Sequence, residues 1–376
     1  MALRAADRFR ACPALSGFDR IHVQRDSRPF LAFASNDYLG LASHPALAAA
    51  AAKTALQLGF GAGAARLVSG DLPPHRELEA ALSAFLGLPD CLLFPTGYQA
   101  NLGVLTALAG PADLIASDQH NHASIIDGCR LSRATVKVFA HADPHAASAA
   151  LRSTGDFRRR ILVTESLFSM DGDVAPLGQL AAVAAETDSL LVVDEAHALG
   201  AVGPDGRGSC AAAGVVPDVL IGTLGKAFGA SGGFVAGQTP LRDYLVNRAR
   251  TFIFTTAPPP LVAAAGTAAI SIATAAEGAH LRATLRSNCQ QLAAGLRSLR
   301  LLPPSQPAGP IFPVILGTDQ RALAASQILA ERHLFAPAIR PPTVPPGTAR
   351  LRITVSAQHK PDEIDRLLSA LSALAA

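Results

Sequence analysis

The sequence has few charged residues and no long apolar run, and both absences narrow its class. Charged residues make up 16% of the 376 residues, against about 25% in an average soluble protein, while hydrophobic residues make up 49%. This composition excludes a disordered chain. The length of the chain is that of about two or three domains. No run of about 18 or more apolar residues occurs, so no transmembrane helix is expected. The positive mean hydropathy of +0.29 comes mainly from alanine, a helix former.

The charges that are present are nearly balanced. Lysine and arginine together number 32 and aspartate and glutamate 29, which gives a formal net charge of +3. A binding surface for nucleic acid or an anionic membrane needs a larger basic excess. Neither partner is therefore expected.

Cysteines are few and scattered. The five are Cys12, Cys91, Cys129, Cys210 and Cys289. Their odd number and the absence of a Cys-x-x-Cys pair indicate a reduced intracellular protein without a disulfide framework or a zinc site. Residues 1–16 are basic but hold no apolar core of a signal peptide. We therefore expect a cytoplasmic protein and no metal.

Short apolar runs alternate with helical patterns through the middle of the chain. The runs predict buried strands at 91–94, 114–117, 136–139, 161–164, 190–193 and 219–222. Helices are predicted at 74–86 and 177–186, among others. Continuous apolar strands that alternate with helices are typical of a mostly parallel sheet covered on both faces. The predicted class is therefore α/β.

The composition and the pattern of predicted elements change after about residue 260. An alanine-rich helical region reaches about residue 299, and strands near 313–316 and 351–355 follow a proline-rich stretch. A last helix begins at Pro361, because proline followed by two acids marks a helix start. We expect an N-terminal helix and extended segment (1–45), a large domain (46–259) and a smaller α+β domain (260–376).

Ligands of such sheets bind at the carboxyl ends of the strands, so the polar residues there are candidates for a site. Thr96 and Gly97 lead into a helix expected from about Gln99, and its free N–H groups suit a phosphate, although any strand-to-helix turn uses these residue types. His120 and His122 have no third metal ligand near them, so they cap a helix or stack on a flat cofactor.

Two acidic strand ends resemble other known sites without completing them. The stretch 165–173 has acids and a glycine but lacks the ligand series of an EF-hand. Asp194 and Glu195 end a strand as in a Walker B element, but the glycine loop at 222–227 lacks the spacing and the hydroxyl of a P-loop. Calcium binding and ATP hydrolysis are therefore disfavoured.

A lysine among small residues follows the next strand. Lys226 lies 32 residues after Asp194, and His197 follows that aspartate by three. A partly buried lysine is a carbonyl nucleophile, and a carboxylate can keep a pyridinium nitrogen protonated. With the phosphate turn at Gly97, these residues predict pyridoxal 5′-phosphate (PLP) chemistry.

The sequence resembles the α-oxoamine synthases, PLP enzymes of fold type I, from about residue 4 to residue 371. The matching strings are Ser-Asn-Asp-Tyr-Leu-Gly (35–40), Arg-Leu-Val-Ser-Gly (66–70), Asn-His-Ala-Ser (121–124), Phe-Ser-Met-Asp-Gly (168–172), Asp-Glu-Ala-His (194–197) and Gly-Thr-Leu-Gly-Lys (222–226). Each string alone is weak, but six in the same order are specific. The resemblance implies a large domain with a mostly parallel sheet and a smaller C-terminal α+β domain.

The resemblance also implies how the cofactor ring is held. Lys226 would form the Schiff base, and Asp194 would pair with the pyridine nitrogen. His197 and Ser169 would hydrogen-bond the ring hydroxyl oxygen. His122 would stack on the face of the ring.

The phosphate and the subunit partner follow from the same resemblance. The backbone N–H groups of Gly97 and Tyr98, together with Thr223, would hold the phosphate. Thr256 matches a residue that family members donate from the neighbouring subunit. A homodimer with a shared active site is therefore expected.

The substrates are implied by a further set of residues. Arg352 would clamp the carboxylate of the amino acid, since an arginine fork suits that contact, and Asn36 would assist. Arg10, Arg340 and Thr343 are candidates for the acyl substrate. An arginine facing the distal carboxylate of the acyl chain would explain a dicarboxylic preference.

Two segments, 4–10 and 338–345, favour one activity within the family. It is the decarboxylative condensation of L-alanine with a pimeloyl thioester, carried on coenzyme A or on an acyl carrier protein. The alternatives are a sister enzyme that uses glycine or serine with another acyl-CoA and, remotely, a non-catalytic PLP-binding module. Two departures from the family pattern, at 61–65 and at Phe254, leave the cofactor set unchanged.

Overall fold

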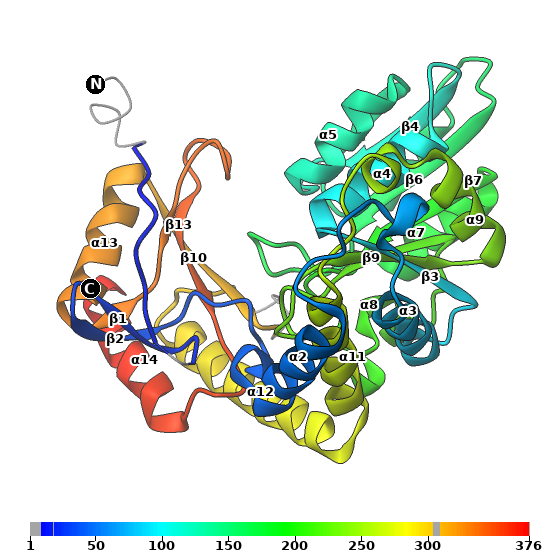
Figure 1. Ribbon diagram of the computed structural model, residues 1–376. Helices are drawn as coiled ribbons and strands as arrows, with labels where there is room; N and C mark the ends of the chain where they lie inside the picture. Colours follow the sequence, from blue (N-terminus) through cyan, green and yellow to red (C-terminus); the bar gives the residue numbers. More distant parts are fainter. Residues whose placement is uncertain (1–8, 18, 304–308, 376) are drawn as a thin grey trace. The chain divides into compact units, whose positions relative to one another are not determined.

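The computed structural model describes residues 9–17, 19–303 and 309–375 (Figure 1). Its backbone divides into two compact units. Unit 1 combines the described residues up to Ser43 with Ser169–Asp173 and the described residues from His280 onward. Unit 2 consists of His44–Phe168 and Val174–Ala279. The expected division at residues 45 and 259 stays a prediction.

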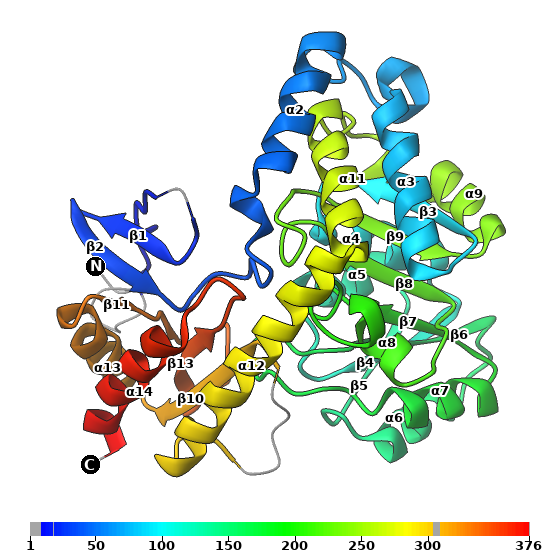
Figure 2. The same ribbon diagram turned by 90° about the horizontal axis from the view of Figure 1, so that it is seen from below.

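A seven-stranded sheet forms the centre of unit 2. Its strands follow the order β3-β9-β8-β7-β6-β4-β5 (Figure 2). Their bounds are β3 Asp90–Phe94, β4 Asp113–Asp118, β5 Thr135–Phe139, β6 Arg159–Glu165, β7 Ser189–Asp194, β8 Val219–Thr223 and β9 Gly233–Gly237. β9 runs antiparallel to both of its neighbours, and the pairs from β8 to β5 are parallel.

Both faces are buried in the middle of this sheet, where successive strand residues pack into different cores, whereas the edge strand β5 is largely exposed. Ile161 and Val163 of β6 join one hydrophobic core, while Leu162 joins a second core. β7 alternates in the same way, with Val192 in the first core and Val193 in the second. The predicted two-sided α/β sheet is therefore confirmed, and strand ends gather at one edge.

The helices of unit 2 cover these faces. Their bounds are α2 Pro45–Leu58, α3 Pro73–Leu86, α4 Gly97–Leu108, α5 Ala123–Ser132, α6 Pro144–Leu151, α7 Leu177–Glu186, α8 Gly208–Ala212, α9 Thr239–Arg248, α10 Arg250–Ile253 and α11 Pro260–Thr274, with short helical turns η1 Leu41–Ser43 (of unit 1), η2 Arg66–Gly70 and η3 Pro204–Gly206. Helices α2, α3 and α11 lie side by side (Figure 2). The alanine-rich region predicted after residue 260 forms two helices that are separated at Ala275.

All six strands predicted for this sheet are present, and the predicted helices match α3 and α7. Strand β9 was not predicted, because its short sequence begins and ends with glycine. Gly233 at its start is required by close packing, since a Cβ there would lie 2.5 Å from the backbone nitrogen of Gly97. The missed strand therefore brings its backbone against the start of α4.

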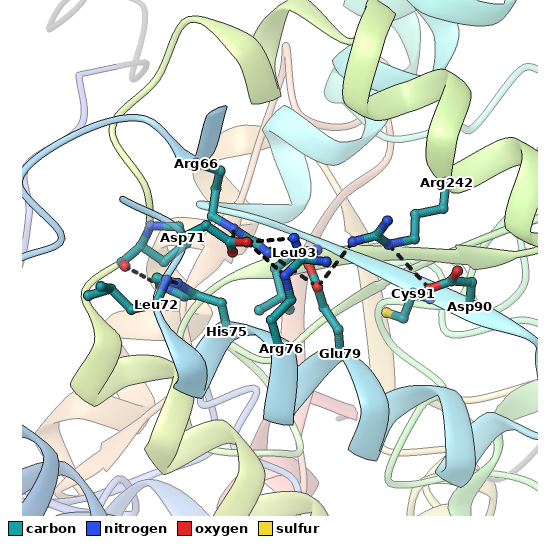
Figure 3. Close-up of polar contacts among 11 residues, drawn as sticks. Arg66, Asp71, Leu72, His75, Arg76, Glu79, Asp90, Cys91, Leu93 and Arg242 are labelled. Atoms are coloured by element: carbon teal, nitrogen blue, oxygen red, sulfur yellow. Dashed lines mark hydrogen bonds and ion pairs between the residues drawn. The ribbon is translucent and has the colours of Figure 1, made fainter. Parts of the chain in front are cut away.

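A buried charge network anchors the Arg-Leu-Val-Ser-Gly string at η2 (Figure 3). Arg66 donates to both carboxylate oxygens of Glu79 at 2.9 and 3.2 Å and to Asp71 at 2.5 Å. Glu79 also accepts from the Leu93 N–H at 2.9 Å and lies 3.8 Å from Arg242. The string thus ties η2 to α3 and to strand β3.

The described residues of unit 1 form two small sheets and three α-helices besides the short turn η1. The sheets are β1 His22–Arg25, β2 Arg28–Ala32 and β11 Leu334–Phe335, and β10 Ile311–Gly317, β13 Ala349–Thr354 and β12 Ala338–Ile339. The helices are the part of α12 (Ala276–Ser298) from residue 280, α13 Asp319–Glu331 and α14 Pro361–Ala375. β2 pairs in parallel with β11, so the start of the chain joins a late segment.

The predicted strands near 313–316 and 351–355 and the helix beginning at Pro361 are confirmed as β10, β13 and α14. Strands β1, β2, β11 and β12 and helix α13 were not predicted. The helix expected around residues 4–7 lies outside the described residues. Within the described part of the chain, no single helix is long and apolar enough to cross a membrane; α11 and α12 meet that criterion only as a bent pair.

Candidate active site

Asp194 ends strand β7 at the carboxyl edge of the unit 2 sheet. Its side chain is buried, and the residue is 6% exposed. Its carboxylate accepts a hydrogen bond from Asn101 Nδ2 at 2.7 Å and one from the Ala196 N–H at 2.9 Å. Two donors from two different segments therefore fix the orientation of this carboxylate.

His122 caps the start of α5, and its surroundings connect the predicted catalytic residues. Its Nδ1 accepts from the Ser124 N–H at 3.2 Å. His122 as a residue is exposed, but partial desolvation of its ring lowers its pKa, the charge of Lys226 lowers that pKa further, and Asp194 and Asp127 oppose the shift. The structure thus brings His122, Asp194 and Lys226 close enough to interact electrostatically.

The start of α4 lies beside the end of β8. Helix α4 begins at Gly97, two residues before the predicted start, and the Thr96 hydroxyl caps it by accepting from the Gln99 N–H at 3.1 Å. The N–H groups of Gly97 and Tyr98 are in the first turn, where a helix offers no acceptor. A Cβ on Gly97 would lie 3.6 Å from the Cβ of Thr223. The predicted phosphate residues are therefore neighbours.

The other predicted residues of unit 2 have different settings. His197 is 6% exposed in the turn after β7. Thr256 is exposed after α10. The Tyr98 ring is also exposed, and its hydroxyl donates to the Asp127 carboxylate. His120 stacks on His141, with ring centroids 4.0 Å apart.

Unit 1 brings together three of the predicted residues at β13. Arg352 is 6% exposed. Its Nε donates to the backbone oxygen of Ser169 at 2.6 Å, and both terminal nitrogens donate to Asn36 Oδ1 at 3.1 Å. The predicted carboxylate clamp therefore has its guanidinium fixed by two neighbours.

The three predicted acyl-substrate residues also gather in unit 1. Arg10 Nη2 donates to Thr343 Oγ1 at 3.0 Å and to the backbone oxygen of Arg340 at 3.3 Å. All three line a cavity of about 360 Å³ together with Phe9 and Ile339. Residues more than 300 positions apart thus form one basic pocket.

Comparison with known proteins gives the family. The model of the aminotransferase class I and II family matches residues 28–371. The 8-amino-7-oxononanoate synthase of Anaeromyxobacter dehalogenans (strain 2CP-1) is 50% identical over 354 residues, which cover 94% of this chain and 88% of the relative. That of Halorhodospira halophila is 48% identical and covers 99% of this chain and 92% of its own. The chain belongs to the 8-amino-7-oxononanoate synthase family.

Solved structures agree with this placement. Serine palmitoyltransferase of S. paucimobilis with bound PLP-myriocin aldimine superposes with a TM-score of 0.92 at 31% identity, covering 96% of this chain and 92% of that one. An 8-amino-7-oxononanoate synthase of Francisella tularensis gives 0.80 at 27%, covering 92% and 97%. The predicted α-oxoamine synthase family, fold type I and PLP-dependent acyl transfer are confirmed.

The side chains of unit 2 fit PLP. A buried carboxylate with a fixed orientation ends β7, and β8, whose Ile221 pairs with Asp194, leads to the half-buried Lys226. The first turn of α4 lies beside Thr223, where a phosphate finds N–H donors. An anchoring amine, a counter-ion for a ring nitrogen and a phosphate site are thus all present.

Two residues at this edge were missed by the sequence reasoning. Asn101 is 2% exposed and Ser124 is 1% exposed, and Asn101 Nδ2 donates to Ser124 Oγ at 3.0 Å. The available signal was a lone amide on an otherwise apolar helix face, since Ala100, Val104 and Leu105 of α4 are all buried.

Proposed function

We propose that the chain condenses L-alanine with a pimeloyl thioester and releases carbon dioxide and the thiol, giving 8-amino-7-oxononanoate for biotin synthesis. The observation that carries this proposal is the convergence of His122, Asp194 and Lys226 in unit 2, in a chain 46–50% identical to synthases of that name.

The residues of unit 2 have distinct tasks in this proposal. PLP supplies an electron sink for the negative charge that develops at Cα of the amino acid. Lys226 anchors the cofactor covalently, and its freed Nζ takes the α-proton as general base. Asp194 keeps the pyridine nitrogen protonated, His122 and His197 contact the ring, and Gly97 starts the phosphate site.

Tyr98 and Thr223 complete that phosphate site, the first through its backbone N–H and the second through its hydroxyl. Thr223 Oγ1 is held in place, since it donates to the Gly232 carbonyl oxygen at 2.9 Å and accepts from the Gly225 N–H at 3.2 Å. Its Oγ1 keeps a lone pair but has no second hydrogen. In the proposed site, the hydroxyl turns its hydrogen from the Gly232 oxygen to a phosphate oxygen, while the Gly225 N–H keeps Oγ1 in place.

The residues of unit 1 bind substrate groups. Arg352 attracts the alanine carboxylate through its positive charge and through the terminal N–H groups that Asn36 and Ser169 do not occupy, and Asn36 keeps the guanidinium oriented. Ser169 is held by the same arginine and contacts the ring hydroxyl oxygen. Over the reaction, a bond forms between Cα and the acyl carbon, the C–S bond breaks to give the thiol, and the carboxylate leaves as carbon dioxide while Cα regains a proton.

The basic pocket of Arg10, Arg340 and Thr343 suits the distal carboxylate of the pimeloyl chain. A charge-assisted hydrogen bond from a guanidinium contributes about 1.5–3 kcal/mol. A dicarboxylic chain would therefore bind more tightly than a monocarboxylic chain of equal length.

The first test is release of free thiol from pimeloyl-CoA by the PLP-loaded protein, with L-alanine, glycine and L-serine in parallel. Release with alanine only is expected. Release only with glycine or serine, or only with another acyl-CoA, would reassign the chain to a sister activity. If no CoA ester reacts, pimeloyl-acyl carrier protein is the next donor, and silence with that donor too would refute the proposal.

We also propose a homodimer with a shared active site to which Thr256 is donated. Thr256 is exposed, and Phe254 beside it is 69% exposed. The Ala257 N–H donates to the Ala64 oxygen at 3.0 Å, which joins this segment to the exposed Phe60 and Val68 region. A second copy would cover these apolar side chains.

Sedimentation velocity tests the dimer, and subunit mixing tests the shared site. Lys226→Ala and Thr256→Ala subunits should each be impaired alone, while mixed dimers should regain one intact site. A monomer, or mixtures no more active than the separate variants, would contradict the shared site. The cytoplasmic location stays a prediction that cell fractionation can check.

A further inference from the structure

Asn101 and Ser124 connect the two residues proposed to flank the cofactor ring. Asn101 Nδ2 donates to Asp194 Oδ2 at 2.7 Å and to Ser124 Oγ at 3.0 Å. Ser124 Oγ in turn lies 2.8 Å from His122 Nδ1. Three successive polar contacts therefore connect the carboxylate of Asp194, at the end of β7, with His122 at the start of α5.

The chemistry of the groups fixes the direction of each contact. An ionised carboxylate only accepts, so the amide nitrogen of Asn101 must face Asp194. That nitrogen carries two hydrogens, and the second reaches Ser124 Oγ. The carbonyl oxygen of Asn101 is then directed elsewhere, and it is buried without a protein partner.

The tautomer of His122 follows from its Nδ1 contacts. The Ser124 backbone N–H points at Nδ1 from 3.2 Å, so this nitrogen must offer its lone pair. Ser124 Oγ already accepts from Asn101, and its own hydrogen is free to point at Nδ1. The ring proton of a neutral His122 therefore sits on Nε2.

The same contacts oppose the charged form of His122. A proton on Nδ1 would face the Ser124 N–H directly, so the imidazolium loses a hydrogen bond that the neutral ring keeps. The charged groups around the ring are Asp194, Lys226 and Asp127. Burial and Lys226 lower the pKa of His122, in the same direction as the two Ser124 donors.

We propose that Asn101 and Ser124 are positioning residues that hold His122 as the neutral Nε2–H tautomer. This rests on the proposed function, in which His122 stacks on the cofactor ring. A neutral imidazole does not repel a pyridinium that Asp194 keeps protonated, whereas an imidazolium would. Through its two amide hydrogens, Asn101 thus sets both the carboxylate and the histidine that the ring meets.

The test is a nitrogen-15 NMR titration of selectively histidine-labelled protein, loaded with PLP and also stripped of it, with His122 assigned by its loss in His122→Asn. The wild type should show an unprotonated Nδ1 and a protonated Nε2, with a pKa below about 6.5. Ser124→Ala removes one donor to Nδ1, so the pKa of His122 should rise by about 0.5–1 unit. Asn101→Ala should raise it in the same direction.

Two further variants keep the test decisive. Ser124→Thr retains the hydroxyl and should keep the wild-type titration. Ser132→Ala is the matched control, because Ser132 is a buried serine of the same helix whose hydroxyl donates to the Cys129 carbonyl oxygen and accepts from the Ala134 N–H. A proton on Nδ1 in the wild type, or a titration that Ser124→Ala leaves unchanged, would overturn the proposal.

Kinetics separates this proposal from the proposed function. In the loaded enzyme, Ser124→Ala should move the acid limb of the kcat pH profile upward by the same fraction of a unit as the NMR pKa. If thiol release with alanine fails with both pimeloyl-CoA and pimeloyl-acyl carrier protein while His122 remains the neutral Nε2–H tautomer, the proposed reaction is wrong and the positioning role stands. If release occurs and the NMR pKa does not move, the positioning role is wrong.

Discussion

Arg352 donates its Nε–H to the backbone oxygen of Ser169 at 2.6 Å. The arginine proposed to bind the substrate carboxylate therefore also holds the serine proposed to contact the cofactor. Arg350, two residues earlier on β13, donates to the Met170 oxygen at 3.1 Å and to the Asp171 carboxylate. Two arginines of one strand thus fix the segment Ser169–Asp173.

Arg352→Lys should weaken alanine binding, because an ammonium lacks the five fixed donors that allow Arg352 to bind Asn36, Ser169 and a carboxylate at the same time. Loss of a charge-assisted hydrogen bond of about 1.5–3 kcal/mol corresponds to a roughly 10- to 150-fold rise in KM for alanine. The KM for the thioester should stay the same. Initial rates at varied alanine measure this, and an unchanged alanine KM would remove Arg352 from the carboxylate site.

Lys226→Ala should abolish turnover and the covalent attachment of PLP. Mass spectrometry after borohydride reduction detects that attachment, and thiol release measures turnover. Lys137→Ala is the control, since Lys137 is an exposed lysine of β5, and it should behave as the wild type. If Lys226→Ala still turns over, Lys226 is not the general base of the reaction.

Arg340→Ala should weaken binding of an acyl chain that ends in a carboxylate and should leave binding of a monocarboxylic acyl chain unchanged. The KM for pimeloyl-CoA should rise roughly 10-fold or more through loss of a charge-assisted contact, while a monocarboxylic acyl-CoA of the same length should be unaffected. Arg321→Ala, an exposed arginine of α13, is the control. Equal losses for both acyl chains would show that the basic pocket does not recognise the distal carboxylate.

Glu79→Gln should destabilise unit 2 without touching the proposed site. Glu79 is 5% exposed and accepts two bonds from Arg66 and one from the Leu93 N–H. Breaking one side of a buried ion pair costs about 3–5 kcal/mol. Glu77→Gln changes an exposed glutamate of the same helix and should cost less than about 0.5 kcal/mol. Urea unfolding compares them, and equal midpoints would contradict the role of this network.

His359 should make unit 1 sensitive to acid. Burial lowers the pKa of His359 from 6.5 to about 4, and the facing charges are those of Glu363, which raises it, and His22, which lowers it. The unfolded chain binds this proton first, so stability is complete above about pH 6.5 and falls as the pH drops toward 4. Relative to His359→Gln, the wild type should lose about 3 kcal/mol over that window.

Urea unfolding of both proteins at several pH values measures this difference. The buried Asp37, whose pKa burial raises to about 6, changes stability in the opposite sense, because its folded form holds the proton more tightly. Its effect cancels in the comparison, since both proteins carry it. Parallel pH curves for the two proteins would contradict the role of His359.

The sequence was informative where burial acts on a continuous run of residues. β6 and β7 were predictable because a parallel strand covered on both faces must be apolar throughout. β9 was not predicted, because Gly233 at its start is required by its close approach to Gly97, and this approach exists only in the folded chain. β1 was not predicted, because only Val23 of its four residues is buried and the strand therefore has no apolar run.

The site divides in the same way. Residues that contact a cofactor directly, such as Asp194 and Lys226, are constrained by chemistry and lie at strand ends, so spacing and resemblance found them. Ser124 lies within the matching string 121–124, but its contact with Asn101 depends on the packing of α4 against α5, which no local pattern encodes. Arg10 and Thr343 were expected from the resemblance alone, and a hydrogen bond joins them.

The pairing of β2 with β11 has a consequence for how the chain is made. Leu31 pairs with Leu334, about 300 residues later. A ribosome adding about 5–20 residues per second takes roughly 15–60 s to cover that distance. During that time β11 has not been synthesised, so Phe30 and Leu31, which are buried in the folded protein, lack their neighbouring strand. The strands of the unit 2 sheet are all synthesised earlier, since the last of them ends at Gly237. A nascent chain released before its C-terminal quarter would expose this apolar hairpin, which makes truncation at that stage a route to aggregation.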